Sequence, residues 1–293
     1  MKPEIIKINL QEKLHSIKAN NPFEDFAYLR AMEESNSASE KSGWIPEHIG
    51  EIKNKKLISF MPLYKKFNSY GEFIFDHQWA NALQRTGRSY YPKLLTAIPF
   101  TPCEGDRILA ENEQSKLSLI DAGIKKMETE KIESWHILFP NEACKTVLKE
   151  KGFVERFNYR FTWVNENFED FDNFLSIFTS RQRATIRKER KGIAKQGIKF
   201  VCKQHDEITT EDWDLFHVFY QKTYYERGQD PYLNRDFFKL INAANQIVKP
   251  VIFFAEIAGE PIGASLCFEG SNTLYGRHWG GTATLKKIHV EYC

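Results

Sequence analysis

The sequence lacks the features that mark several large classes of protein. None of its stretches approaches about 20 consecutive apolar residues, so we expect no transmembrane helix. The first ten residues hold no apolar run of signal-peptide length, which leaves the cytoplasm as the expected location. The net charge is only +2, so no overall field draws the chain to nucleic acid or membrane, and any basic site must be local.

Cysteine is also scarce, and its spacing excludes the common metal sites. The five cysteines are widely separated and form no Cys-x-x-Cys pair or Cys/His ligand set: Cys103, Cys144, Cys202, Cys267 and Cys293. We therefore predict no metal site and free thiols in a reducing compartment, with Cys202 and Cys267 in the core. No Ser/His/Asp spacing supports a covalent hydrolase either.

What the chain does contain is enough apolar residues for a large core. It has 293 residues, of which 42% are hydrophobic and 14% aromatic, enough for two domains of ordinary size or one large one. The most unusual stretch is 69–107, where aromatic residues, glycines, prolines and an Asp-His pair are concentrated. Such a segment is either a binding wall or a well-packed connection.

Hydrophobic periodicity predicts a mixed α/β chain. In the first half we expect an edge strand at 4–8, a helix capped by Asn21, a hairpin of strands 44–52 and 57–67, and a short helix at 77–84. A buried strand follows at 93–98, a helix at 112–131, a strand at 134–139, a helix capped by Asn141, and one or two strands within 153–164.

The second half shows a similar alternation. The aromatics of 168–178 suggest core packing, and 180–196 reads as a strongly basic helix. We then expect a strand at 198–202, a helix at 210–227 capped by Thr209 or Thr210, and a helix at 234–246 capped by Asn234. A hairpin of strands 250–257 and 261–268 and a strand at 273–279 complete the pattern.

The two hairpins resemble each other in sequence. The segment 49–57 aligns with 254–262, and both contain Glu-Ile before the turn. If the match is real, the chain holds two copies of one unit, with a first domain at 1–165 and a second at 166–293. By this comparison the second copy lacks about 80–100 residues, so we expect a truncated form of a longer protein.

Longer motifs carry a resemblance to a known family. They include Gly43-Trp44-Ile45-Pro46, Ser69 to Asp76, Tyr90-Tyr91-Pro92-Lys93-Leu94, Ser180-Arg181-Gln182-Arg183 with Ile186 to Arg190, and Leu274 to Gly280. The chain resembles FemAB-like proteins of the GNAT superfamily, the predicted N-acyltransferases of peptidoglycan biosynthesis or recognition. The resemblance implies a tandem GNAT-like fold, with mixed sheets flanked by helices and an incomplete second unit. His289 to Cys293 resembles the start of a helix that members continue.

The resemblance implies transfer of an acyl or aminoacyl group to an amine. No bound cofactor is expected, and the candidate donors are acyl-CoA and aminoacyl-tRNA. The nearest approach to a CoA pyrophosphate loop, Gln84 to Ser89, has the wrong last residue and follows no strand, which weighs mildly against acetyl-CoA. The expected partners are an anionic or nucleotide-linked substrate and tRNA. The oligomeric state is not predicted.

The candidate catalytic residues are Asp76, His77 and Tyr91. Asp76 or His77 could deprotonate the attacking amine, although Asp76 could simply cap a helix. Tyr91 could protonate a leaving group, or with Tyr90 hold a core edge by its hydroxyl.

The candidate substrate-binding residues are mostly basic. Arg183 and Arg187 share a helix stripe with Lys191 and suit phosphate, although a charge run is often only a solvated face. On one predicted strand Tyr275, Arg277 and Trp279 are expected to share a face, either as a ligand wall or as ordinary cation–π packing. Lys93 precedes a strand, and Arg107 comes from the resemblance.

Two other functions compete with the transferase. A non-catalytic module would bind a cell-wall precursor without consuming a donor. An RNA-binding protein would use the basic helix of 181–191 and bind RNA in a salt-sensitive manner.

Overall fold

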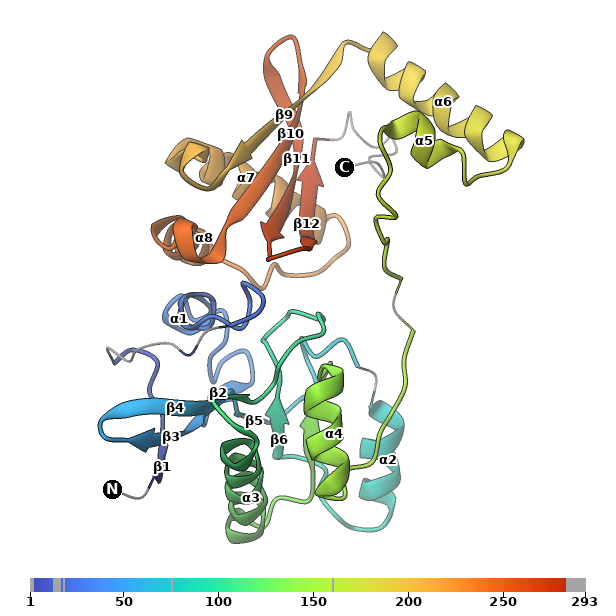
Figure 1. Ribbon diagram of the computed structural model, residues 1–293. Helices are drawn as coiled ribbons and strands as arrows, with labels where there is room; N and C mark the ends of the chain where they lie inside the picture. Colours follow the sequence, from blue (N-terminus) through green and yellow to red (C-terminus); the bar gives the residue numbers. More distant parts are fainter. Residues whose placement is uncertain (1–2, 13–16, 18, 75, 160, 283–293) are drawn as a thin grey trace.

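The structure is a computed structural model, and it describes residues 3–12, 17, 19–74, 76–159 and 161–282. These residues form three four-stranded sheets flanked by helices (Figure 1). The predicted mixed α/β class is confirmed. No helix of the described residues is both long and apolar enough to cross a membrane.

Two sheets lie in the N-terminal half. The first is antiparallel in the order β1 (Glu4–Lys7), β3 (Ile49–Lys53), β4 (Lys56–Met61), β7 (Leu109–Ala110). The other has the order β2 (Trp44–Pro46), β5 (Tyr64–Lys66), β6 (Lys93–Thr96), β8 (Trp135–Ile137), and its last pair is parallel. The edge strand predicted at 4–8 is confirmed as β1.

The hairpin predicted from 44–52 and 57–67 pairs as expected but is divided between both sheets. Its two long strands break at Glu47–His48 and Pro62–Leu63. There the Leu63 amide donates to His48 Nδ1 at 3.0 Å, and the Glu47 amide donates to the Leu63 carbonyl at 2.8 Å. A side chain thus replaces a ladder bond, and the pair passes from one sheet into the other.

The C-terminal sheet repeats the plan of the first sheet. Its order is β9 (Ile198–Gln204), β10 (Pro250–Ile257), β11 (Glu260–Glu269), β12 (Leu274–Gly281), all antiparallel. The hairpins β3–β4 and β10–β11 both turn on two residues of positive φ, Asn54–Lys55 and Ala258–Gly259. Both also carry a register shift just before that turn. The sequence echo therefore lies on two hairpins of the same form, and the tandem GNAT arrangement stays a prediction.

Side-chain caps begin most of the helices. The helices are α1 (Phe26–Glu34), α2 (His77–Arg85), α3 (Glu113–Glu130), α4 (Glu142–Glu150), α5 (Phe171–Leu175), α6 (Ser180–Lys195), α7 (Thr210–Tyr225), α8 (Arg235–Ala243) and α9 (Asn245–Val248), with a 3₁₀ turn at His205–Glu207. The predicted caps Asn141, Thr209 and Asn234 each accept a hydrogen bond from an amide of the first turn. The helix predicted at 234–246 is two helices.

The first helix begins later than predicted. Asp25 caps α1, because its carboxylate accepts from the Ala27 amide at 2.8 Å. Asn21 instead closes the turn before it, with its side-chain oxygen accepting from the Phe23 and Glu24 amides.

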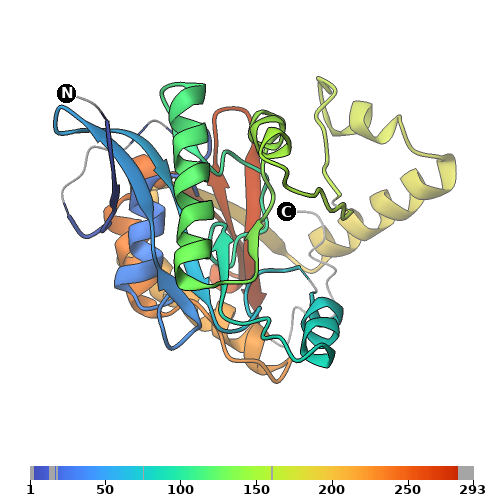
Figure 2. The ribbon, with the colours of Figure 1, turned by 90° about the horizontal axis from the view of Figure 1, so that it is seen from below.

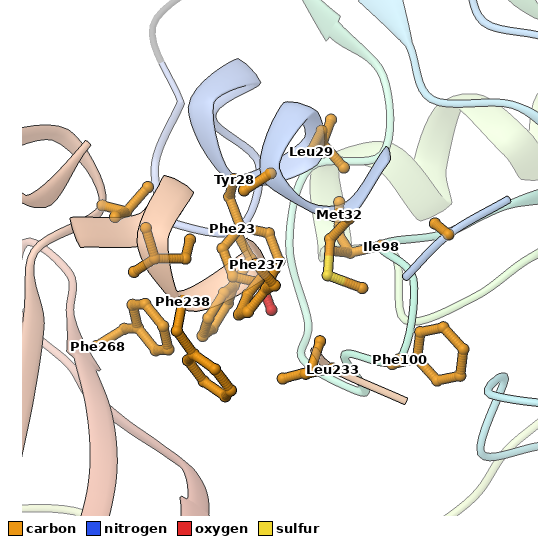
Figure 3. Packing of buried hydrophobic residues seen from close by; sticks show 14 of the residues in the cluster. Phe23, Tyr28, Leu29, Met32, Ile98, Phe100, Leu233, Phe237, Phe238 and Phe268 are labelled. Carbon is orange, nitrogen blue, oxygen red and sulfur yellow. The ribbon is translucent and has the colours of Figure 1, made fainter. Parts of the chain in front are cut away.

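Two cores lie on opposite faces of the β2-β5-β6-β8 sheet. On one face α3 and α4 cover a cluster that includes Leu94. On the other face Leu95 belongs to a larger cluster that joins α1 to α7, α8 and the C-terminal sheet. Figure 2 shows α3 lying across the sheets, and Figure 3 shows Tyr28 of α1 close to Phe237 of α8. The two halves are therefore held together by a shared apolar core.

Three expectations for the middle and end of the chain are wrong. The residues 153–159 and 161–164 form no strand, and Phe161 is fully exposed. The aromatics of 168–178 pack on one another beside α5, but only Leu175 is buried. Cys202 is exposed, because it lies on the open face of β9. His289 to Cys293 lies outside the described residues.

Candidate active site

The site starts from two lysines that face each other in the middle of a sheet. Lys66 of β5 pairs directly with Lys93 of β6, and both side chains are completely buried. Lys66 Nζ lies 3.9 Å from the centre of the Trp44 ring on the neighbouring strand and donates to the Tyr70 carbonyl at 3.0 Å. Like charges directly opposite each other destabilise a sheet, so this pair needs buried anions close by.

A loop after β5 supplies those anions. Lys93 Nζ donates to Glu72 Oε2 at 2.8 Å and to Asp76 Oδ2 at 2.5 Å, and both carboxylates are almost fully buried. Its third hydrogen bond goes to Ser69 Oγ at 2.9 Å. The second oxygens, Glu72 Oε1 and Asp76 Oδ1, are buried without a hydrogen-bond partner among the described residues. The loop therefore neutralises the lysines and leaves two acceptor atoms unused.

Hydroxyl groups and an imidazole form the accessible edge of this cluster. Tyr91 Oη lies 2.7 Å from Ser69 Oγ, and both residues are half-buried. Tyr90 Oη donates to Asp76 Oδ2 at 2.6 Å and lies 3.1 Å from His136 Nε2 of β8. His136 pairs with Leu95 across the parallel strands, which puts it on the same face as Lys93. The residues that surround Lys93 thus come from the loop after β5, from the segment just before β6, and from strands β5 and β8.

Burial sets the acid–base properties of the cluster. It lowers the pKa of Lys66 to about 7, an effect that the carboxylates of Glu72 and Asp76 oppose and Lys93 reinforces. Burial also raises the pKa of Glu72, although Lys93 acts against it. Burial and nearby Lys93 lower the pKa of His136 to about 4, so its imidazole is neutral at physiological pH.

Asp76 behaves differently from Glu72. Burial alone would raise its pKa, but hydrogen bonds from Lys93, Tyr90 and Ser69 outweigh burial and lower the pKa to about 2. A carboxylate of this kind is a weak base, which makes Asp76 an anchor for Lys93. Glu72 is the better proton acceptor of the two, because its pKa lies closer to neutral.

The structure brings together three of the predicted site residues: Asp76, Tyr91 and Lys93. The capping interpretation of Asp76 is wrong, because its side chain makes no cap hydrogen bond at the start of α2. His77 is exposed on α2, outside this cluster. Three further residues of the cluster were not predicted from the sequence: Lys66, Glu72 and His136. No local pattern singles out these three residues, because strand register and contact with Lys93 bring them into the site.

Arg107 lies in a separate buried site. Its guanidinium donates to the Leu138 carbonyl at 2.8 Å and to the Cys103 carbonyl, and its Nη1 lies 3.7 Å from Glu24 Oε1. All of these partners belong to the protein backbone or to Glu24. Substrate binding by Arg107 stays a prediction.

The basic helix is confirmed as α6, and its charges divide into two groups. Arg187 pairs with Asp172 at 2.8 Å and Arg190 lies over the Phe171 ring, so these two fasten α6 to α5. Arg183 belongs with them, because it donates to the Phe178 carbonyl in the connection just before α6. A second group shares another side of the helix and has no ion-pair partner among the described residues: Arg181, Lys188, Lys191 and Lys195. Figures 1 and 2 show α6 projecting away from the sheets.

The predicted common face of Tyr275, Arg277 and Trp279 is wrong. A register shift makes Arg277 an extra residue in β12, because His278 pairs with Leu266 while Gly276 pairs with Cys267. The bulge reverses the alternation after it, so Tyr275 packs on Phe23 whereas Trp279 lies on the other face and is exposed. Arg277 reaches the N-terminal half, where it donates to the Phe100 carbonyl.

The described residues contain no cluster of His, Cys, Asp and Glu that could hold a metal ion. Gln84 to Ser89 begins in the last turn of α2 and continues past its C-terminal end, where carbonyl groups rather than amides are free. That location disfavours anion binding by this loop.

Comparison with known proteins gives one family and a likeness to several solved structures. The FemAB-like family model, described as peptidoglycan biosynthesis/recognition, matches residues 4–293. A search of the curated proteins found no match. The crystal structure of FemX is similar at 11% identity and a TM-score of 0.49, over 97% of this chain and 82% of that one. A conserved protein of unknown function from Bacteroides thetaiotaomicron is similar at 9% identity and a TM-score of 0.43, over 93% and 80%.

Proposed function

Because the chain belongs to the FemAB-like family of peptidoglycan biosynthesis and recognition, we propose that it transfers an acyl or aminoacyl group to an amine, with a peptidoglycan precursor as acceptor. One observation carries the proposal. The half-buried hydroxyls of Ser69 and Tyr91 stand in front of a buried Lys93 held between two carboxylates.

Acyl transfer to an amine needs a group that accepts a proton and a group that stabilises negative charge on the acyl oxygen. Glu72 suits the first role, since burial raises its pKa and its Oε1 has no partner among the described residues. Tyr91 suits the second role, because its hydroxyl lies at the accessible edge. The Lys93 charge behind Ser69 favours negative charge in front of it.

The unpaired side of α6 supports an anionic donor or acceptor. Arg181, Lys188, Lys191 and Lys195 present four cations along one helix with no acidic partner among the described residues. Aminoacyl-tRNA and a nucleotide-linked precursor both carry the phosphates that such cations bind, and acyl-CoA does as well. The donor therefore stays a choice between acyl-CoA and aminoacyl-tRNA, and the cytoplasmic location stays a prediction.

The test is a transfer assay with each donor class in turn. The purified protein is incubated with a nucleotide-linked muropeptide and either acyl-CoA or aminoacyl-tRNA, and the acceptor mass is measured. We expect a mass increase with one donor, and Tyr91→Phe should lower the rate about 100- to 1,000-fold, as removal of an oxyanion donor does. Tyr225→Phe on the exposed part of α7 is the matched control and should keep the rate.

The competing functions give different outcomes in the same experiment. A non-catalytic module would bind the muropeptide while the donor stays intact. An RNA-binding protein would bind deacylated tRNA as well as aminoacyl-tRNA without modifying any acceptor. If either result is obtained with every donor, the proposal that the protein is a transferase is overturned.

A further inference from the structure

The loop that carries Ser69, Glu72 and Asp76 rests on one aromatic ring. Gly71 has φ +79°, and a Cβ placed there would lie 2.4 Å from Phe100 Cε1. The centres of the Tyr70 and Phe100 rings lie 5.6 Å apart, and the Tyr70 carbonyl accepts the hydrogen bond from Lys66. Any displacement of Phe100 therefore reaches the loop directly, since no gap separates the ring from the glycine.

Phe100 is itself held in an unfavourable conformation. Its φ is +53°, a left-handed value that costs a bulky residue free energy and persists only when the surroundings impose it. The surroundings include two residues of the C-terminal half. The Tyr232 ring stacks on Phe100 at 4.2 Å with 8° between the planes, and Arg277 Nη2 donates to the Phe100 carbonyl and to Thr101 Oγ1.

The β12 bulge explains why Arg277 can make this contact. The extra residue turns the Arg277 side chain toward the N-terminal half, where its guanidinium also lies 5.8 Å from the centre of the Phe23 ring. Figure 3 shows Phe100 at one edge of the shared core, next to Leu233. The loop lies against this edge of the core. Contacts from the C-terminal half to Phe100 therefore continue through Tyr70 to Lys66.

We propose that Arg277 is a positioning residue, which together with Tyr232 fixes Phe100 and through it the described loop residues, 69–74 and 76, beside Lys66 and Lys93. The C-terminal half thus sets the geometry of a site whose reacting groups all belong to the N-terminal half. The expected effect of this positioning on the rate of acyl transfer rests on the proposed function. Its expected effect on the surroundings of Lys66 does not depend on any catalytic activity.

Lys66 gives a readout that is independent of activity. The charged groups around it are Glu72 and Asp76 of the loop and Lys93 of β6, and Tyr70 faces Tyr224 and Asp230 of the C-terminal half. If the loop loosens, water reaches the Lys66 amine and its charged form is no longer disfavoured. The titration midpoint of Lys66 should then move from near neutral toward the ordinary lysine value.

The experiment is an NMR titration of the full chain labelled with ¹³C at lysine Cε, with the Lys66 signal assigned by its loss in Lys66→Met. For Arg277→Leu and for Tyr232→Leu we expect the Lys66 midpoint to rise by about one pH unit or more. Arg277→Lys keeps a donor and should give a smaller rise. Arg235→Leu, which removes an exposed ion pair with Asp214, is the matched control and should leave the midpoint unchanged.

The proposal is overturned if folded Arg277→Leu and Tyr232→Leu both keep the parent midpoint within about 0.2 units, since an intact environment then does not need Phe100 to be fixed. If Arg277→Leu does not fold, the Lys66 midpoint is compared in the milder variants Tyr232→Leu and Arg277→Lys. The proposal is then overturned if both of these keep the parent midpoint. Where the transfer assay succeeds, Arg277→Leu should lower kcat about 10- to 100-fold with little change in KM. Failure of every donor would leave the titration result valid, so the two proposals fail separately.

Discussion

Two buried basic side chains of the N-terminal half, Arg107 and Lys93, are held in contrasting ways. Arg107 directs its hydrogen bonds at the carbonyls of Leu138 and Cys103, with Glu24 nearby. Lys93 directs all three of its hydrogen bonds at side chains, namely Ser69, Glu72 and Asp76. Both cations are completely buried, so burial alone does not distinguish them.

The partners show what each cation does. A guanidinium bonded to backbone carbonyls ties two chain segments together, and the close approach of Gly105 to Glu24 leaves no room for a side chain between them. An ammonium bonded to carboxylates and hydroxyls instead influences groups that can exchange protons. The first arrangement is suited to stability and the second to chemistry, which is a difference that mutation can test.

The largest effect is expected on transfer when Glu72 becomes Gln. The amide keeps the shape of the side chain but cannot accept the proton, so the rate should fall about 100- to 10,000-fold. In the parent the rate should rise with pH as Glu72 loses its proton, at a pH above the ordinary glutamate range because burial raises its pKa. A pH–rate profile of both proteins checks this. An unchanged profile in Glu72→Gln would remove this residue as the base.

The second effect is on stability, and it concerns the other cation. Arg107→Met should lower the free energy of unfolding by about 3–5 kcal/mol, because Glu24 is left as an unpaired buried charge. Urea denaturation measures the loss, with the exposed Arg235→Met as control. Transfer per folded molecule should stay at the parent value. A folded Arg107→Met protein without activity would place Arg107 in substrate binding after all.

A smaller effect separates the two carboxylates of Lys93. The pKa of Asp76 is lowered to about 2 from an ordinary 3.8, so its charge stabilises the fold above pH 3.8 and ceases to do so as the pH falls toward 2. Asp76→Asn should lower the free energy of unfolding by about 2 kcal/mol at pH 6. Between pH 4 and pH 2 the free energy of unfolding should fall less in Asp76→Asn than in the parent, because the variant has no carboxylate to protonate. Denaturation at several pH values measures both. The exposed Asp236→Asn is the control and should show the same stability as the parent at each pH. If Asp76→Asn loses as much stability in acid as the parent does, the stabilising role of the Asp76 charge is contradicted.

Local signals predicted most of the elements, because caps and turns act over a few residues. Asn141, Thr209 and Asn234 mark helix starts, and Ala258–Gly259 marks a hairpin turn. The strand expected within 153–164 failed, since alternating aromatics there meet no partner strand among the described residues. Trp279 was assigned to the wrong face because a bulge depends on strand pairing, which periodicity does not contain.

The candidate site could be predicted only in part for the same reason. Asp76, Tyr91 and Lys93 stand out in one stretch of sequence. Their partners Lys66 and His136 reach them through the register of β5, β6 and β8, which no local pattern specifies. Glu72 was hidden because its chemistry comes from burial next to Lys93 rather than from its own neighbours in the sequence.

The smallest effect concerns cations that are not buried at all. Arg187 already pairs with Asp172, whereas Lys191 is exposed without an ion-pair partner among the described residues. If α6 binds phosphates, Lys191→Glu should weaken binding of labelled deacylated tRNA about tenfold and lower the salt-dependence slope by about 1. Arg187→Glu should act mainly by loosening α6 from α5, and Lys239→Glu on α8 is the exposed control. Salt-dependent binding curves decide the matter. If Lys191→Glu keeps the parent affinity and slope, α6 is a solvated surface and does not recognise phosphate.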